Sequence, residues 1–306
     1  MRAVITGGTG LIGQALSANM AADGYEVIVL SRTPAQAPAM PPGVHAAHWD
    51  ARTAAGWGSL VDGADAVVNL AGASIARRWT RQYKQLIKES RLSAARAVVE
   101  AVDQATVKPR VLVQASGIGY YGPQGNEILT ETSPPGEDFL ARFAVEWENS
   151  TAAVETMGVR RTIIRSGAVL STAGGSFPMM SLPFRFFVGG PLGSGRQWLP
   201  WIHIADEVAA IRFLIDNEEA SGPFNLVAPD IQTNADFSRV LAQVMHRPNL
   251  FRVPAFAMRL LLGEMSVILL EGQRAAPQRL SDLGFTFRFP NLDAAIRNLL
   301  QKGEES

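Results

Sequence analysis

The chain has 306 residues, of which 47% are hydrophobic, which is enough to bury a large core and favours two associated lobes over one. Its 28 lysines and arginines balance 28 aspartates and glutamates, so no net field attracts nucleic acid or an anionic membrane, and we expect neither as a partner. The absence of cysteine excludes disulfides, thiolate metal ligands and cysteine nucleophiles, and we expect no metal site.

The first predicted element is a strand over Arg2–Ile5, which runs into Thr-Gly-Gly-Thr-Gly-Leu-Ile-Gly at Thr6–Gly13. A helical pattern then extends from about Leu11 to Asp23 and ends at Gly24, a common helix-stopping residue. A strand, a glycine-rich turn and a helix in this order are the setting that a dinucleotide-binding site requires. Because the strand pattern starts at once, we expect no signal or transit segment and a cytoplasmic protein.

The glycines of this turn have separate tasks. Gly7 permits the sharp turn out of the strand, Gly10 lets the backbone approach a pyrophosphate, and Gly13 allows the helix to pack closely on the sheet. A diphosphate would then rest on free N–H groups at the helix N-terminus, where the macrodipole is positive. The alternative is a tight turn with a purely structural purpose.

The second predicted strand, Glu26–Leu30, is followed by Ser31 and Arg32. At this place an NAD-preferring site usually offers a carboxylate to the ribose hydroxyls. An arginine can pair with a 2′-phosphate instead, so the sequence favours NADP(H) over NAD(H). The alternative is a solvated arginine in a proline-rich loop.

The third and fourth predicted strands end in further candidates for the cofactor site. Val44–Trp49 is followed by Asp50, which lies where a side chain can contact the adenine, although an ordinary turn aspartate is the alternative. Ala66–Leu70 leads into Ala71 and Gly72. Small residues at the carboxyl end of a strand suit a cofactor that lies across the edge of an open α/β sheet.

A long helix is predicted within Ile75–Arg96, and it carries many basic residues and a single acidic one, Glu89. Because the chain is neutral and has little aromatic interleaving here, nucleic-acid binding is a poor explanation. We expect most of the basic side chains to form the solvated face, with one of Arg77 or Arg78 able to reach the cleft. The apolar face would hold Leu86, Ile87, Leu92, Ala95 and Val98.

The fifth strand, Arg110–Gln114, delivers Ser116 to the ligand edge, where its hydroxyl can contact a substrate. After it, Phe139, Phe143 and Trp147 recur at helical spacing and are expected to face the core. The sixth strand is Arg161–Arg165. Strands that alternate with helices predict an α/β fold with a doubly wound parallel sheet of the Rossmann type.

Beyond Leu170 many glycines and prolines indicate long loops, which are candidates for a substrate wall or a lid. Trp201–Asp206 then leads into a helix that ends near Asn217, with Asp206 as a plausible N-cap. The remaining predicted elements are a strand over Phe224–Val227, a helix over Asn234–Met245 and a largely helical tail from Val253, in which the apolar stretch Met258–Leu270 is too short to span a bilayer.

We therefore expect a dinucleotide-binding domain over residues 1–170, to which 201–230 return. Residues 171–200 and 231–306 are expected to form a smaller, mostly helical substrate lobe.

The chain carries the motifs Thr6-Gly7-x-x-Gly10-x-x-Gly13, Asn69-Leu-Ala-Gly72, Ser116 before Tyr121-Gly122, and Trp201-Ile-His-Ile-Ala-Asp206. Together they resemble the extended short-chain dehydrogenase/reductase superfamily of nucleotide-sugar epimerases and dehydratases. The segments from Gly119 to Phe139 and from Val253 to Arg288 are similar to an atypical subgroup, the epimerase family proteins, which has its own small C-terminal domain.

This resemblance spans essentially the whole chain and implies the site. Near the adenosine and the diphosphate it implies contacts from Gly7, Gly10, Leu11, Ile12, Gly13, Arg32, Asp50, Leu70, Ala71 and Gly72. Near the nicotinamide it implies Ser116, Gly167 and Val169. The partner would be a small-molecule substrate. Extended relatives often dimerise through two helices that correspond here to Leu86–Val102 and Phe139–Val154, so a homodimer is possible.

The superfamily's chemistry normally depends on a Tyr-x-x-x-Lys pair, in which the lysine lowers the tyrosine pKa and holds the ribose. No tyrosine of this chain has a lysine at that spacing. If Glu148 is aligned with the glutamate that often follows the pair, Leu140 and Ala144 take the two positions. The register one residue earlier offers Phe139 and Phe143, and neither register can move a proton.

Two hypotheses remain. In the first, the chain is an NADP(H)-binding oxidoreductase of the epimerase/dehydratase type that acts on a small carbonyl, hydroxyl or sugar-like substrate. Ser116 would then polarise the carbonyl, and Tyr120, Tyr121 or His203 would supply the proton. Tyr121 and His203 also have structural alternatives, as a ring closing the cleft and as a satisfied histidine in a strand.

In the second hypothesis the chain binds NADP(H) without turnover, as a redox sensor or scaffold. We prefer the enzyme, because long ordered loops such as those after Leu170 are usually functional and are not needed to hold NADP(H) alone.

Overall fold

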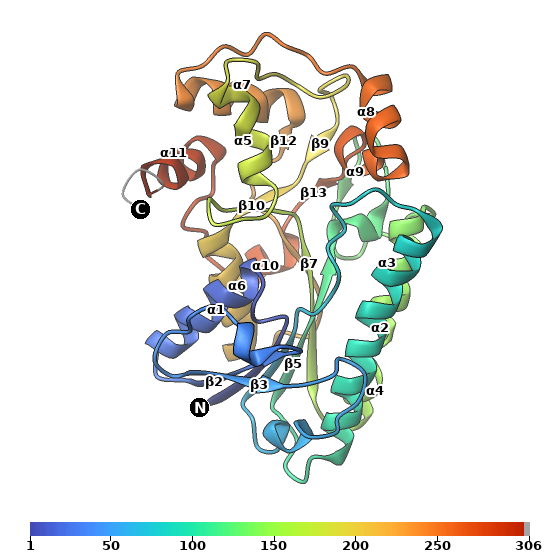
Figure 1. Cartoon of the computed structure of the whole chain (residues 1–306), viewed down its shortest axis with the longest axis vertical. Helices are drawn as coiled ribbons and strands as arrows, with labels where there is room; N and C mark the ends of the chain where they lie inside the picture. The colour runs from blue at the N-terminus through green and yellow to red at the C-terminus, as the bar shows by residue number, and fades with distance from the viewer. Residues whose placement is uncertain (303–306) are drawn as a thin grey trace.

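In the computed structural model, which describes residues 1–302, the chain is built on a seven-stranded sheet in the order β11-β7-β5-β4-β1-β2-β3 (Figure 1). Every pairing within this sheet is parallel. Its strands are β1 (Arg2–Thr6), β2 (Glu26–Ser31), β3 (Val44–His48), β4 (Ala66–Asn69), β5 (Val111–Gly117), β7 (Arg160–Ser166) and β11 (Gly222–Leu226). The predicted α/β fold with a doubly wound, Rossmann-type sheet is confirmed.

Helices cover both faces of the sheet (Figure 1). One face carries α1 (Leu11–Ala22) and α6 (Ile204–Asp216), and the other carries α2 (Arg81–Gln104), α3 (Phe139–Asn149) and the short α4 (Ala153–Thr156). Because the strands are buried on both faces, they are apolar runs rather than alternating patterns, which is why the sequence revealed them. The short 3₁₀ helices of this part are η1 (Pro34–Gln36), η2 (Gly58–Val61) and η3 (Ile118–Tyr121).

The strand order reverses between β1 and β4, since the chain runs outward from β1 to β3 and then returns to the other side of β1. In open α/β sheets the crevice at such a switch point, outside the carboxyl ends of the strands, binds the ligand. The glycine turn after β1 and the small residues after β4 lie at this point.

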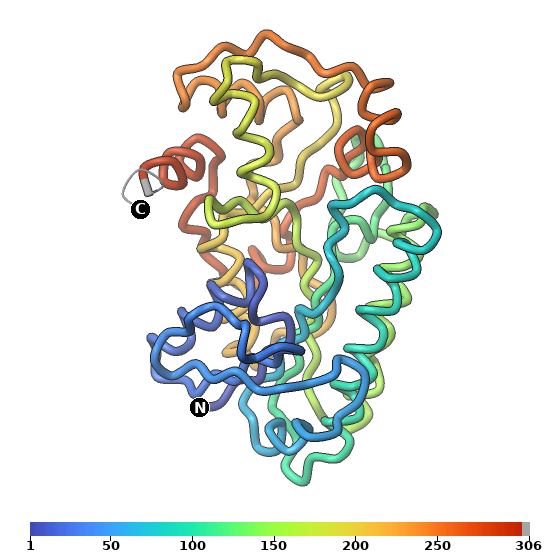
Figure 2. Tube along the Cα trace, in the orientation of Figure 1, coloured from blue at the N-terminus to red at the C-terminus, as the bar shows by residue number. Residues whose placement is uncertain are grey.

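The second lobe consists of short elements above the carboxyl edge of the sheet (Figure 1). Its strand pairs are β8 (Ala168–Leu170) with β10 (Trp201–His203), β9 (Trp198–Leu199) with β12 (Gln232–Thr233), and β6 (Ile128–Leu129) with β13 (Arg274–Ala275). Its helices are α5 (Phe177–Arg185), α7 (Asn234–Met245), α8 (Ala255–Leu262), η4 (Gly263–Ser266), α9 (Val267–Leu270) and α11 (Leu292–Lys302). Figure 2 traces the chain into this lobe after β8, back to the sheet through α6 and β11, and then into the lobe again.

The C-terminal segment does not stay within the upper lobe. Helix α10 (Gln278–Asp282) returns to the sheet, where Leu280 is fully buried in the same core as α1, α6 and β11. The ring of Phe285 lies 5.5 Å from that of Phe213 on α6. The tail expected in the substrate lobe therefore also completes the sheet's core.

Two local expectations are corrected. Asp206 does not cap α6, because the helix begins at Ile204 with His203 as its N-cap, and the Asp206 carboxylate instead accepts the backbone N–H groups of Arg288 and Phe289. Leu86, expected on the apolar face of α2, is 47% exposed. Within residues 1–302, no helix is both long and apolar enough to cross a bilayer.

The apolar faces expected to support dimerisation are used within the chain. Ile87 and Val98 of α2 are fully buried, and Phe143 and Trp147 of α3 are less than 9% exposed. The homodimer stays a prediction.

Candidate functional site

The glycine turn after β1 packs closely against the backbone at the end of β4. Gly7 has φ of +67°, and a Cβ added to it would lie 2.8 Å from the backbone carbon of Leu70. A Cβ on Gly13 would lie 2.5 Å from the carbonyl oxygen of Gly7. Only glycine satisfies both conditions, because it tolerates positive φ and has no side chain to separate the two segments.

Helix α1 begins at the cleft with Gly10 as its N-cap, and no side chain caps its first turn. Its first N–H groups therefore remain available to an anion at the positive end of the helix. A pocket lies beside this end, between α1 and the loop that follows β8. Its lining residues are Leu11, Gln14, Ala15, Ser171, Ala173, Gly174, Gly175 and Ile204.

Arg32 lies just beyond β2, is exposed, and forms no ion pair with any residue that the structure describes. Its guanidinium is therefore available to a ligand phosphate.

Asp50, which lies beyond β3, already accepts hydrogen bonds from its own turn. Its Oδ1 accepts the N–H groups of Arg52 at 2.7 Å and Thr53 at 2.9 Å, and its Oδ2 accepts the Thr53 hydroxyl at 3.0 Å. These hydrogen bonds lower the Asp50 pKa, and the one from the Thr53 N–H has the largest effect, followed by the one from Arg52. Its carboxylate thus has the geometry of a turn aspartate.

A buried polar chain connects the strand ends under the cleft, and the sequence analysis missed it. The Thr6 hydroxyl donates to Asn69 Oδ1 at 2.6 Å and accepts the N–H of Ala71 at 3.2 Å. Asn69 Nδ2 donates to Gln114 Oε1 at 2.8 Å, and Gln114 Nε2 donates to the carbonyl of Ala115 at 2.7 Å. This series of hydrogen bonds joins the carboxyl ends of β1, β4 and β5. It thereby fixes the positions of Ala71 and Ser116, which lie at these ends.

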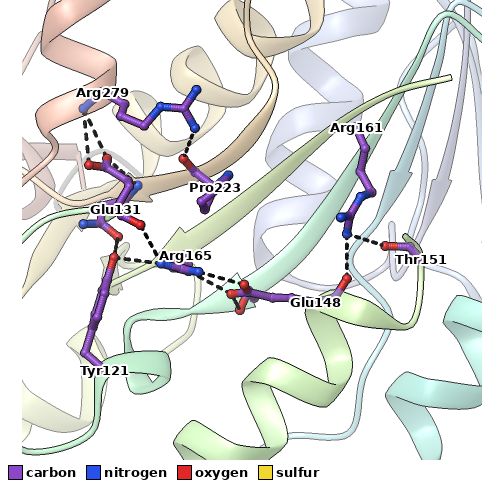
Figure 3. A network of polar contacts seen from close by, with 10 residues as sticks. Tyr121, Glu131, Glu148, Thr151, Arg161, Arg165, Pro223 and Arg279 are labelled. Atoms are coloured by element: carbon purple, nitrogen blue, oxygen red, sulfur yellow. Dashed lines mark hydrogen bonds and ion pairs between the residues drawn. The ribbon is translucent and has the colours of Figure 1, made fainter. Parts of the chain in front are cut away.

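Ser116 lies half-buried at the end of β5, and its hydroxyl donates to Glu148 Oε1 at 2.6 Å. Glu148 is itself held by Arg165, whose Nε and Nη2 each lie 2.8 Å from a carboxylate oxygen (Figure 3). Because a hydroxyl has one proton, Ser116 in this arrangement faces the cleft as a hydrogen-bond acceptor. It can polarise a carbonyl only after it turns away from Glu148.

Tyr121 is fully buried in the same network. Its hydroxyl donates to Asn225 Oδ1 at 2.7 Å and accepts from Arg165 Nη1 at 3.0 Å (Figure 3). Burial raises the pKa of Tyr121 to about 12. Its neighbour Tyr120 is half-buried, with the Arg165 guanidinium carbon 3.4 Å from its ring centroid. The geometry gives Tyr121 a structural place and no path to a ligand.

The network continues into the C-terminal segment. Glu131 Oε1 accepts the N–H of Asn225 at 3.0 Å and the N–H of Arg279 at 3.3 Å. Arg279 Nη1 then donates to the carbonyl of Pro223 at 2.7 Å (Figure 3). Glu131 thus connects the segment before α3, strand β11 and helix α10.

His203 is 3% exposed, and its Nδ1 accepts the N–H of Ala205 at 3.0 Å, which makes it the N-cap of α6. Its ring centroid lies 4.0 Å from that of Phe289. The structure therefore places the His203 side chain in the core, against Phe289.

Gly167 separates β7 from β8, and Val169 is the middle residue of β8; both are half-buried. A Cβ on Gly167 would lie 2.7 Å from the carbonyl oxygen of Pro200, so this glycine is required by backbone packing. Beside them, the Ser166 hydroxyl donates to Glu207 Oε1 at 2.6 Å. Glu207 is fully buried, its Oε2 has no hydrogen-bond partner within the described part of the chain, and burial raises its pKa to about 8.

A second pocket lies between the start of α3 and the second lobe. Leu140, which takes the tyrosine position, lines it and also packs near Gly119. Lys84 and Glu264 form an ion pair at the same place. The lining residues are Trp79, Lys84, Asp138, Phe139, Leu140, Arg259, Gly263, Glu264, Ser266, Val267, Leu270 and Glu271. Aromatic and aliphatic walls with charged groups among them suit a polar organic molecule.

No cluster of three or more histidine or acidic side chains that could hold a metal ion occurs within residues 1–302.

Comparison with known sequences gives matches over both parts of the chain. Residues 3–227 match the model of the NAD dependent epimerase/dehydratase family, and residues 253–299 match a domain of unknown function, DUF1731. An epimerase family protein of Staphylococcus haemolyticus is 43% identical over 300 residues, which cover 97% of this chain and 98% of that protein.

Comparison with solved structures agrees. The human epimerase family protein SDR39U1 (isoform 2), solved with NADPH, matches with a TM-score of 0.88 and 33% identity over 98% of this chain and 99% of its own. A nucleoside-diphosphate sugar epimerase of Corynebacterium glutamicum matches with a TM-score of 0.79 and 35% identity, over 98% of this chain and 58% of the bacterial one.

Proposed function

Because the chain belongs to the NAD-dependent epimerase/dehydratase family, as its motifs predicted, we propose that it is an NADP(H)-dependent oxidoreductase acting on a small carbonyl, hydroxyl or sugar-like substrate. The observation that carries this proposal is the glycine turn that opens onto the uncapped N-terminus of α1, beside a pocket. Main-chain N–H groups and the helix dipole are what a dinucleotide diphosphate needs.

The preference for NADP(H) rests on Arg32. Its side chain is exposed at the end of β2 and has no ion-pair partner within the described residues, and the neighbouring Ser31 and Thr33 offer no carboxylate to ribose hydroxyls. A guanidinium can form paired hydrogen bonds with a 2′-phosphate. The human relative solved with NADPH is consistent with this assignment.

The proposed substrate site is the pocket between α3 and η4–α9, which Leu140 lines. When bound, the nicotinamide supplies or accepts a hydride. The chain itself must then position the substrate, exclude water and handle a proton on the substrate oxygen. Leu140 and Ala144 cannot do this, because neither has an ionisable group.

Of the residues predicted for catalysis, we propose Ser116 for contact with the reacting group. It is half-exposed at the carboxyl end of β5, whereas Tyr121 and His203 are buried at 3% exposure or less. Because the Ser116 hydroxyl donates its hydrogen bond to Glu148, its oxygen can accept a hydrogen bond from a substrate hydroxyl. This arrangement favours oxidation of an alcohol, or binding of a hydroxylated substrate, over polarisation of a carbonyl.

The second candidate function is a redox sensor that binds NADP(H) without turnover, and the missing Tyr-x-x-x-Lys pair is the observation that favours it. The two are separated by titrating the purified chain with NADPH and NADH by calorimetry and then testing a panel of carbonyl compounds, alcohols and nucleotide sugars. The enzyme hypothesis expects tighter binding of NADPH and turnover with at least one panel member. Tight binding without any turnover supports the sensor, and binding of neither coenzyme refutes both.

A further inference from the structure

Arg91 is the exception among the basic residues of α2, which were expected to be solvated. Its guanidinium packs against the end of β4, so that a Cβ on Gly72 would lie 2.7 Å from its Cζ. Its Nη1 donates to the carbonyl oxygens of Ala73 at 2.9 Å and Ile87 at 3.3 Å. Gly72 is itself exposed at the sheet edge, so the guanidinium borders the crevice in which the cofactor is proposed to lie.

This cation has no counter-ion in the described part of the chain. No carboxylate within residues 1–301 pairs with Arg91, and its Nε and Nη2 form no hydrogen bond with the described residues. Its Cζ lies 4.8 Å from the ring centroid of Trp147, and burial lowers its pKa to about 10. By contrast, Arg161 and Arg165 are each paired with a glutamate at 2.8 Å. A half-buried cation without an anion is unfavourable, so its place beside a crevice points to a ligand.

The position of Arg91 is related to the missing catalytic pair. Trp147 follows Ala144, the residue at the lysine position, by three residues on α3, so the two lie on the same side of that helix. The guanidinium over Trp147 is therefore next to the turn of α3 from which a lysine would extend. Ala144 has only a methyl group, which leaves that space to a side chain from α2.

We propose that Arg91 is a cofactor-binding residue that supplies from α2 the cation that is missing at the lysine position of α3, and that its unused donors bind the ribose hydroxyls and phosphate of the nicotinamide half of NADP(H). The assignment rests on the proposed function. It explains why the chain can lose the lysine and still hold the nicotinamide ribose. It also defines Arg91 as a binding and positioning residue, since a guanidinium does not exchange protons near neutrality.

The test separates the two halves of the cofactor. Four proteins are compared: wild type, Arg91→Met, Arg91→Lys and the matched control Arg96→Met. Each is titrated with NADPH, by its fluorescence, and with adenosine 2′,5′-bisphosphate, which lacks the entire nicotinamide mononucleotide half of the cofactor. Arg96 is on the same helix but exposed, with its Nη2 on Ser93. We expect Arg91→Met to weaken NADPH binding at least about tenfold, and to change bisphosphate binding less than about twofold. Arg91→Lys should fall between, because it keeps the charge and loses the fork.

The assignment is overturned if Arg91→Met loses affinity for both ligands equally, or if it loses affinity for neither. The ratio of the two affinities is measured on one sample, so a general loss of stability in Arg91→Met does not imitate the expected selective effect. If Arg91→Met does not fold, Arg91→Lys decides by the same ratio. A wild-type chain that binds neither ligand refutes the proposed function itself, which is a different outcome from the selective loss expected here.

Discussion

The hydroxyl of Ser116 donates to Oε1 of Glu148 at 2.6 Å, across 32 positions of sequence, and Arg165 holds the same carboxylate through two further hydrogen bonds. Glu148 and Arg165 therefore determine the orientation of the Ser116 side chain at the carboxyl end of β5. This relationship determines which hydrogen bonds Ser116 can offer a ligand.

Replacement of this hydroxyl tests its role in the reaction. Ser116→Ala should lower kcat at least about tenfold, because an oriented hydrogen bond to the reacting group is lost, while NADPH affinity stays unchanged. Steady-state kinetics and an NADPH titration check this on the same preparation. Ser59→Ala, an exposed serine in η2, serves as the control. An unchanged kcat in Ser116→Ala would show that the Ser116 hydroxyl does not contact the reacting group.

Removal of Glu148 should destabilise the fold. Glu148→Ala leaves Arg165, only 4% exposed in its side chain, without its partner. Loss of one member of a buried pair typically costs about 3–5 kcal/mol. Glu146→Ala on the same helix removes an exposed pair with Lys88 and should cost about 1 kcal/mol or less. Urea unfolding compares the two variants, and equal losses contradict the prediction.

The coenzyme preference depends on the charge at position 32. Arg32→Glu should weaken NADPH binding at least about tenfold, because a carboxylate repels the 2′-phosphate, while NADH binding changes little or improves. Calorimetric titration with both coenzymes measures the ratio. Arg142→Glu, an exposed residue on α3, makes the same change in net charge and should leave the ratio unaltered. A wild type that prefers NADH refutes the assignment before any variant is made.

The turn requires glycine at position 13. A Cβ there would lie 2.5 Å from the carbonyl oxygen of Gly7, so Gly13→Ala forces α1 away from the turn and should weaken NADPH binding at least about tenfold. Gly24→Ala, at the end of the same helix, meets no atom within 4 Å but has φ of +81°. It should cost about 1 kcal/mol of stability and leave affinity unchanged. Wild-type affinity in Gly13→Ala shows that the turn does not hold the diphosphate.

Glu207 should make stability fall as pH rises. Burial raises its pKa from 4.5 to about 8, so between these values the folded chain keeps a proton that the unfolded chain releases. The unfolded state then binds fewer protons, and the free energy of unfolding decreases by up to about 1.4 kcal/mol per pH unit from this group. Above pH 8 this contribution is constant.

Glu207→Gln should remove this slope and be more stable than wild type near pH 8, because the amide can occupy the site without ionising. Unfolding at pH 5, 6, 7 and 8 gives the difference between variant and wild type at each pH. Glu219→Gln, an exposed residue, should leave the slope unchanged. A difference that does not grow with pH means that Glu207 is ionised throughout.

Much of the fold could be read from the sequence, because its signals lie within a few residues of one another. A buried parallel strand is a short apolar run, and a strand, a glycine turn and a helix follow in order at Arg2–Ala22. Each strand of the main sheet was predicted near its place. The spacing of Gly7 and Gly13 also predicted where backbone segments approach too closely for a Cβ.

The catalytic candidates were less predictable. His203 and Tyr121 are residue types that move protons, yet one caps α6 and the other joins Arg165 and Asn225 in the core. Asp206 was the cap expected from the sequence, yet His203 caps the helix. The outcome depended on where the helix could begin beside β8 and on the backbone N–H groups of Arg288 and Phe289, which the Asp206 carboxylate accepts.

The sequence by itself determined the sheet, the glycine turn and the family, since these depend on side-chain periodicity and on backbone freedom at single positions. Only the tertiary structure decided that Arg91 is half-buried without a counter-ion among the described residues, that Glu207 is enclosed beside Ser166, and that Ser116 is oriented by Glu148. Each of these facts joins residues on different elements. Their burial and charge environment follow from how helices pack on the sheet, which no local pattern specifies.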